Sequence, residues 1–135
     1  MKTRSFCQLT LKNKPKTPEG LVFLQKWGSL RHASNVAFLC LHAANRGVVG
    51  SEYAVLAQRQ IDYILGDNKR GFSYQIGFGS RYPSQPHHRS SSCPASGGCS
   101  WADFNRAGPN QQVLKGALVG GLKSAGLFVW PDQFR

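Results

Sequence analysis

The sequence has few acidic residues and no long apolar run. Its six Asp and Glu residues are outnumbered by seventeen Lys and Arg, which leaves a formal net charge of +11 over 135 residues. No apolar run approaches the roughly 20 residues that a membrane-spanning helix needs, so we expect no membrane partner. Residues 1–10 are basic and lack the apolar stretch of a secretory signal peptide. Taken alone, this N-terminus predicts a chain that stays in the cytosol.

The basic surplus makes nucleic-acid binding one hypothesis. The Lys and Arg residues are scattered along the chain, however, and no predicted helix carries a basic stripe. We favour the alternative that acidic partner segments lie outside this sequence, and we expect no nucleic-acid partner. Hydrophobic residues make up 41% of the chain, which is enough for a core and too many for a disordered protein. The length favours one domain.

Two segments have the three- and four-residue spacing of amphipathic helices. The first runs from about Leu30 to Arg46, follows Ser29 at an N-cap position, and is closed by Gly47. Its expected buried face consists of Leu30, Ala33, Ala37, Cys40, Leu41 and Ala44.

The second segment starts after Ser51, runs to about Leu65 and ends at Gly66. Its expected buried face consists of Ala54, Ala57, Ile61, Ile64 and Leu65. A third helix is predicted to begin near Asn110 and to cover residues 113–119.

The remaining segments predict little regular structure. Residues 1–19 are polar, contain two prolines and read as an irregular lead-in. Residues 67–112 are rich in Gly, Ser and Pro, and loops of such length are usually functional or disordered. Their aromatic content argues against disorder. Within them Tyr74, Ile76 and Phe78 alternate as in a short strand.

Four cysteines are present. Cys40 lies in an apolar helical pattern and is expected to be a buried thiol. Cys93 and Cys99 flank a loop of small residues, where a disulfide is plausible in an oxidising compartment, although sequence alone leaves the pairing open. A zinc site made of His87, His88, Cys93 and Cys99 is a weaker alternative. Adjacent histidines do not converge easily on one ion, and the spacing fits no common zinc template.

The run Pro86-His87-His88-Arg89 is the best candidate for binding chemistry. Pro86 favours extended backbone before it, and residues two apart in an extended segment point to the same side. His87 and Arg89 would then share one face. Imidazole and guanidinium donors beside aromatic rings suit a hydroxyl-rich sugar. The aromatic residues nearby in sequence are Tyr74, Phe78, Tyr82 and Trp101. The alternative is that both side chains only tie down a long loop by bonding backbone carbonyls.

Several segments together resemble the glycoside hydrolase family 9 endoglucanases. They are residues 27–35 (WGSLRHASN), 60–68 (QIDYILGDN), 73–79 (SYQIGFG) followed by 86–94 (PHHRSSSCP), and 109–121, which ends in GALVGG. Their order and spacing fit the family over roughly residues 17–121, which is more specific than any single motif. The Ser-Ser-Ser-Cys-Pro run is more similar to the animal branch than to the plant branch.

The resemblance implies an all-α fold, a partial (α/α)6 barrel of which this chain would hold only the late helices. A long irregular active-site loop and possible short strands would accompany them. It also implies hydrolysis of internal β-1,4-glucosidic bonds with inversion, without a cofactor or a metal. One carboxylate activates water and a carboxylic acid protonates the leaving oxygen. In the family the Asp base lies upstream of the matched region, and the Glu acid follows the Gly-Gly pair. Neither has a counterpart in this sequence.

The resemblance also assigns roles to three residues. His87 matches the family's catalytic-centre histidine, which contacts the sugar at the cleavage point. Arg89 matches the arginine two residues later, and Trp27 matches an aromatic residue that stacks on a neighbouring sugar. The expected partner is β-1,4-glucan, either cellulose or cello-oligosaccharides, and the family is secreted. We expect residues 1–121 to be the C-terminal part of the catalytic domain and residues 122–135 to be an aberrant tail.

Three functions compete on this basis. The first is an endoglucanase by descent that is inactive alone, because it lacks both catalytic acids. The second is a non-catalytic carbohydrate-binding remnant that uses His87, Arg89 and the aromatic rings. The third, which we favour least, is a basic nucleic-acid-binding protein.

Overall fold

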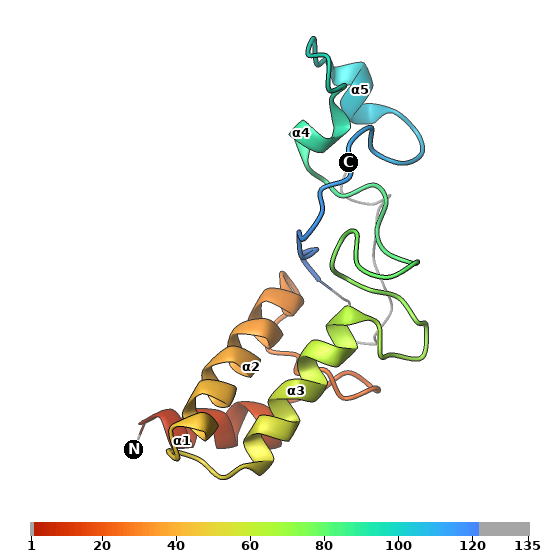
Figure 1. The fold of residues 1–135 in the computed structure, drawn as a ribbon. Helices are drawn as coiled ribbons and strands as arrows, with labels where there is room; N and C mark the ends of the chain where they lie inside the picture. The colour runs from red at the N-terminus through yellow and green to blue at the C-terminus, as the bar shows by residue number, and fades with distance from the viewer. Residues whose placement is uncertain (1, 122–135) are drawn as a thin grey trace.

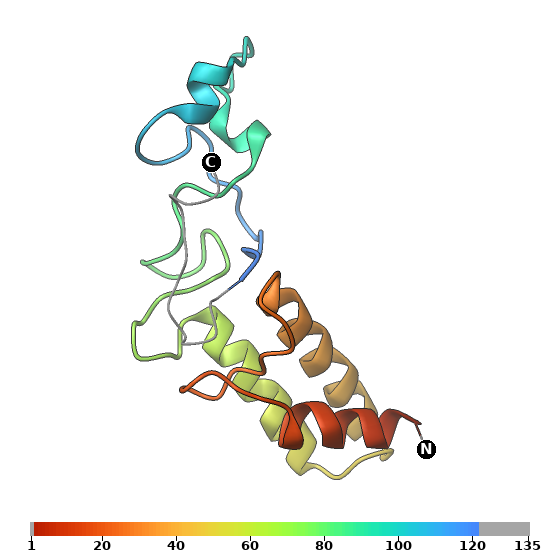
Figure 2. The ribbon, with the colours of Figure 1, turned by 180° about the vertical axis from the view of Figure 1, so that it is seen from behind.

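The computed structural model describes residues 2–121. Its elements in chain order are α1 (Lys2–Cys7), the π-helix η1 (Gln8–Asn13), α2 (Ser29–Asn45), α3 (Glu52–Leu65), α4 (Arg89–Ser92) and α5 (Trp101–Asn105). Figure 1 shows α2 and α3 side by side as a helical hairpin, with α1 across one end of the pair. From the other end an irregular segment extends away to α4 and α5, as the reverse view in Figure 2 also shows. Among residues 2–121 no helix is long and apolar enough to cross a membrane.

The helical hairpin confirms the two helices predicted from the spacing. α2 begins one residue earlier than expected, because Gly28 in the left-handed conformation (φ 64°) takes the N-cap position and Ser29 is buried inside the first turn. α3 ends at Gly66, which has a φ of 119°. The buried faces differ from the prediction in part. Leu41 is exposed and Ala54 half-buried, whereas Tyr53, Gln60 and Tyr63 are buried.

The N-terminal prediction was wrong. Residues 2–13 are helical rather than irregular, and Cys7 and Leu11 are buried against α2 and its neighbours. Cys40 was expected to be a free thiol, but it forms a disulfide with Cys7 across a sequence separation of 33. The cross-link joins α1 to α2 and limits the freedom of the unfolded chain. No helical pattern within 2–13 predicts this partner for Cys40.

The C-terminal predictions were also wrong in detail. No helix covers residues 113–119; the chain turns there, and Val119 and Ala117 hydrogen-bond the backbone of Tyr74 and Ile76. The expected strand is reduced to an isolated antiparallel bridge between Gln75 and Leu118. The long irregular stretch itself is confirmed. Residues 122–135, for which an aberrant tail is predicted, lie outside the described residues.

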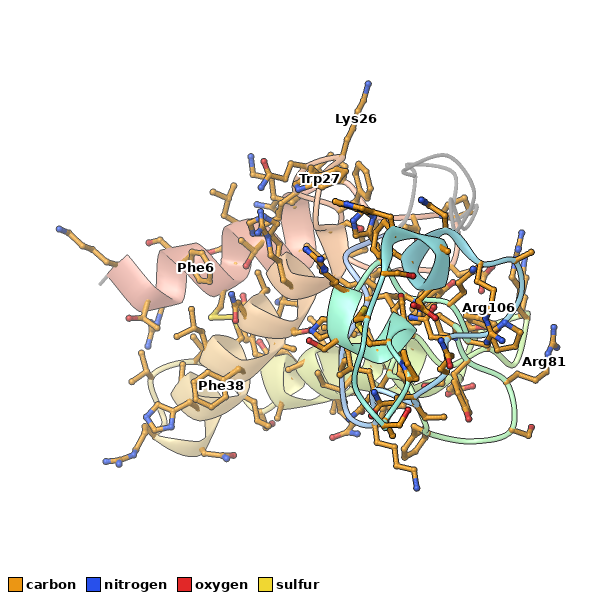
Figure 3. The ribbon with its side chains drawn as sticks, turned by 90° about the horizontal axis from the view of Figure 1, so that it is seen from above. Phe6, Lys26, Trp27, Phe38, Arg81 and Arg106 are labelled. Carbon is orange, nitrogen blue, oxygen red and sulfur yellow. A yellow bond between two sulfur atoms is a disulfide. The ribbon has the colours of Figure 1, made fainter. Side chains whose placement is uncertain are left out.

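Two hydrophobic clusters make the core. One lies where the irregular segment meets the hairpin and contains Leu21, Leu30, Ala33, Tyr63, Ile64, Tyr74, Ile76 and Val119. The other lies at the α1 end and contains Cys7, Leu11, Val22, Val36, Cys40, Ala43, Val49 and Tyr53. Some apolar side chains remain outside both. Phe38 on α2, which is labelled in Figure 3, is 69% exposed.

A buried amide joins α3 to the segment before α2. The Gln60 side chain accepts a hydrogen bond from the Val22 backbone N–H at 2.7 Å and donates to the Gly20 carbonyl at 3.2 Å. Gln60 is only 5% exposed, so water cannot readily replace these bonds.

Replacing Gln60 by Leu should therefore destabilise the fold. We expect the free energy of unfolding to fall by about 1–3 kcal/mol, because the buried Val22 N–H loses its acceptor. Gln58→Leu, an exposed position on the same helix, is the matched control and should stay within about 0.5 kcal/mol of the unaltered chain. Urea denaturation followed by circular dichroism measures both. Equal effects of the two substitutions would contradict the role given to Gln60.

Candidate functional site

Four side chains from two short helices and the turn before them form an aromatic–basic cluster. The imidazole of His87 packs edge-on against the Phe104 ring at 5.1 Å between centroids. The guanidinium carbon of Arg89 lies over the Trp101 ring, 5.1 Å from its centroid. Trp101 and Phe104 in turn pack edge to face at 5.8 Å. The four residues form a continuous row from imidazole to guanidinium through two aromatic rings.

The backbone brings His87 and Arg89 together by a route different from the predicted one. The segment is not extended, because the His88 N–H bonds the Pro86 carbonyl at 2.7 Å, which makes a tight turn at His87. His88 is then the N-cap of α4 and accepts from the Ser91 N–H, while Arg89 is the first residue of that helix. Each side chain contacts one ring of the Trp101–Phe104 pair, His87 the phenyl ring and Arg89 the indole, and the shared face for a ligand stays a prediction. The extended geometry behind it was wrong.

The helix that carries the aromatic rings is fixed at its start by a capping box. The Ser100 hydroxyl accepts from the Asp103 N–H, and the Asp103 carboxylate accepts from the Ser100 N–H at 2.9 Å. Hydrogen bonds from the Ser100 hydroxyl and backbone, and from Gln111, hold the pKa of the Asp103 carboxyl below its ordinary value. The carboxylate therefore stays ionised near neutral pH and stabilises the short α5.

A disulfide ties the two halves of the cluster together. Cys93, the C-cap of α4, is bonded to Cys99, which directly precedes the Ser100 cap of α5. The disulfide that the sequence left open is thus present. It also removes the zinc alternative, because a disulfide sulfur is not a thiolate ligand. Among residues 2–121 no group of three or more His, Cys, Asp or Glu side chains is arranged to hold a metal ion.

Three consecutive amide side chains hold the α4 loop from the other side. Asn110 donates to the Pro86 carbonyl at 2.8 Å and to the Ser91 hydroxyl. Gln111 joins the Ser92 carbonyl to the Asp103 carboxylate, at 3.0 and 2.9 Å. Gln112 donates to the carbonyls at positions 90 and 93. This run was predicted to start a helix, but it is irregular. Its side chains instead hydrogen-bond the backbone around α4.

Trp27 lies on a different part of the chain, in the loop just before α2, and is 65% exposed. Figure 3 shows its position near the start of that helix. The C-terminal end of the described chain reaches the same place. A Cβ at Gly121 would come within 2.9 Å of the Ser29 backbone nitrogen, so only glycine fits there without movement.

The arrangement suits binding rather than acid–base chemistry. Arg89 is exposed, and within residues 2–121 no carboxylate lies within 4 Å of its guanidinium. Its N–H donors can therefore reach hydroxyl oxygens of a ligand, with aromatic surface beside them. Asp103, on the same helix as Trp101 and Phe104, uses its carboxylate to accept hydrogen bonds in the capping box of α5. Sequence reasoning did not find Phe104 or the amide run; the only signal was their position just after the histidine segment.

The comparisons with known proteins identify the family. The sequence matches Glycosyl hydrolase family 9 over residues 1–134. It is 39% identical over 137 residues to Endoglucanase 1 of Oryza sativa subsp. japonica, covering 81% of this chain and 21% of that protein. The chain belongs to glycoside hydrolase family 9. It spans about a fifth of the length of the curated relative it matches.

Solved structures agree with this assignment. An endoglucanase from the termite Nasutitermes takasagoensis superposes with a TM-score of 0.86 at 48% identity, covering 94% of this chain and 29% of that one. The cellulase Cel9M of C. cellulolyticum in complex with cellobiose gives a TM-score of 0.78 at 35% identity, with 90% and 27% covered. The predicted partial (α/α)6 fold is thereby confirmed. The termite match supports the animal-type assignment.

Asn110 offers a test of how the cluster is held. Asn110→Ala removes the bonds to Pro86 and Ser91, so the backbone amides of residues 87–92 should exchange with deuterium several-fold faster. Asn35→Ala, an exposed position on α2, is the control and should leave these rates unchanged. Hydrogen–deuterium exchange with mass spectrometry measures both. Unaltered exchange in the Asn110 variant would show that the loop is held by other contacts.

Proposed function

We propose that this chain forms part of the glucan-binding cleft of an inverting endo-β-1,4-glucanase. In this proposal His87 contacts the sugar at the cleavage point, Arg89 donates hydrogen bonds to a neighbouring hydroxyl, and Trp27 stacks on another ring. The observation that carries it is the aromatic–basic cluster, in which imidazole and guanidinium donors lie beside apolar ring faces. A sugar offers the complement, an apolar C–H face with a rim of hydroxyls.

The similarities support the same ligand class. The rice and termite relatives are endoglucanases by name, and Cel9M was solved with cellobiose. Two disulfides, Cys7–Cys40 and Cys93–Cys99, favour an oxidising compartment. They support secretion, as the family resemblance implies.

We propose that this chain binds glucan but does not hydrolyse it. Inversion needs one carboxylate to activate water and one carboxylic acid to protonate the leaving oxygen. We infer that the 135-residue polypeptide lacks both, because the family positions for the Asp base and the Glu acid have no counterpart among its residues. We assign residues 1–121 to the catalytic domain and propose that residues 122–135 depart from it in sequence, within a family match that extends to residue 134.

The first test is hydrolysis. The purified 135-residue chain should release no reducing ends from carboxymethylcellulose above a buffer blank, because general acid and general base catalysis are each worth roughly 10²–10⁴-fold. A reducing-sugar assay with a full-length endoglucanase as positive control measures this. Turnover that follows the chain through purification would sink the proposed inactivity.

The second test is binding. Cellotetraose should bind with a dissociation constant on the order of millimolar, since only part of a cleft is present. His87→Ala and Arg89→Met should each weaken binding several-fold, because each removes a hydrogen-bonding group. The matched controls are His42→Ala and Arg59→Met, both at exposed positions on the helical hairpin. Titration followed by NMR chemical shifts gives the dissociation constants of the unaltered chain and of the four variants.

A parallel titration with DNA tests the nucleic-acid alternative. Binding of a DNA duplex that falls steeply with salt and ignores substitutions at His87 and Arg89 would favour a basic nucleic-acid binder instead. Cellotetraose binding that also ignores both substitutions would remove the cluster from the proposed cleft.

A further inference from the structure

We propose that Trp101 is a positioning residue for Arg89, which it holds in the orientation that meets the glucan. This role rests on the proposed function, because it concerns how the same cluster recognises its sugar. Trp101 carries no role in the family resemblance set out above, and its part follows from the contacts of this chain.

The contact itself is direct. The Arg89 guanidinium lies over the indole of Trp101, 5.1 Å from the ring centroid, which is within the range of a cation–π interaction. Within the described residues no carboxylate forms an ion pair with this guanidinium. The indole is therefore the group that limits the rotamers of a side chain which is otherwise long and exposed. Because an arginine fixed in advance loses less entropy on binding, its hydrogen bonds to a ligand become more favourable.

The indole is suited to this role because its helix is fixed independently of Arg89. The Cys93–Cys99 disulfide holds the start of α5 next to the end of α4. The capping box of Ser100 and Asp103 fixes the first turn, and the Phe104 ring packs against the indole in a T-shaped arrangement with 5.8 Å between centroids. None of these restraints passes through the guanidinium, so the ring can orient Arg89 rather than the reverse.

A different role for Trp101 would be direct stacking on a sugar ring, since the side chain is 66% exposed. The two roles predict different couplings. A positioning residue acts through Arg89, so its removal costs nothing further once Arg89 is gone. A stacking residue makes its own contact, so the two losses multiply. A double-mutant cycle separates these cases.

The experiment uses the 135-residue chain, the variants Trp101→Leu, Trp101→Phe, Arg89→Met and the Trp101→Leu/Arg89→Met pair, and cellotetraose as the probe. Phe38→Leu, an exposed aromatic position on α2, is the control for losing a surface ring. Two readouts come from each sample. One is the NMR shift of the Arg89 side-chain protons without sugar, and the other is the dissociation constant for cellotetraose.

We expect the Arg89 protons to be shifted upfield by the ring current in the unaltered chain, to remain so in part in Trp101→Phe, and to lose the shift in Trp101→Leu. Affinity should fall about two- to five-fold in Trp101→Leu, the range of an exposed cation–π contact. It should be largely retained in Trp101→Phe and unchanged in Phe38→Leu. The double variant should bind as Arg89→Met does.

Two results would overturn the positioning role while leaving the proposed function intact. They are Arg89 protons without an upfield shift in the unaltered chain, and losses in the double variant that multiply. Absence of any cellotetraose binding by the unaltered chain, with the upfield shift present, would overturn the proposed function and the role of Trp101 in it. It would leave only the contact between the two side chains.

Discussion

The site depends on side-chain amides that hydrogen-bond the backbone of a long segment with almost no regular structure. A buried backbone N–H or C=O must find a partner, and residues 67–121 have few ladder or helix bonds to offer. Asn68 meets this need just after α3 by bonding the backbone at positions 63, 70 and 72. Asn110, Gln111 and Gln112 do the same around α4. The segment is ordered by polar contacts that replace the missing secondary structure.

The hydrophobic cores stop short of this region. The cluster that includes Tyr74 and Val119 anchors the base of the irregular segment, and none of the four residues of the aromatic–basic cluster belongs to either core. Packing energy therefore fixes where the segment leaves the hairpin. Hydrogen bonds and the Cys93–Cys99 disulfide fix the conformation of its far end, around α4 and α5. Such a region belongs to the less stable part of a fold, from which binding loops are commonly drawn.

Local patterns in the sequence predicted the helical hairpin well and the site only in part. The apolar spacing of α2 and α3 and their closing glycines are local signals, so both helices could be found within a residue at each end. The contacts of His87 and Arg89 depend on Phe104 and Trp101, which no periodic pattern relates to them. The partner of Cys40 was missed for the same reason, since Cys7 is brought to it by tertiary packing. The amide run 110–112 was misread because its side chains serve the backbone of another segment.

Family membership does not by itself assign the family's chemistry to a chain that spans about a fifth of the length of the curated relative it matches. The family match extends over residues 1–134, which include the hairpin, the histidine segment and the stretch that reaches the start of α2 at Gly121. Within residues 2–121, the aromatic–basic cluster consists of hydrogen-bond donors and aromatic faces and contains no carboxylate. Asp103, which lies nearest the cluster, is held ionised by its cap and cannot readily act as a proton donor near neutral pH. The cluster therefore offers donors and ring faces for binding, in line with the proposal that assigns glucan recognition rather than proton transfer to this portion.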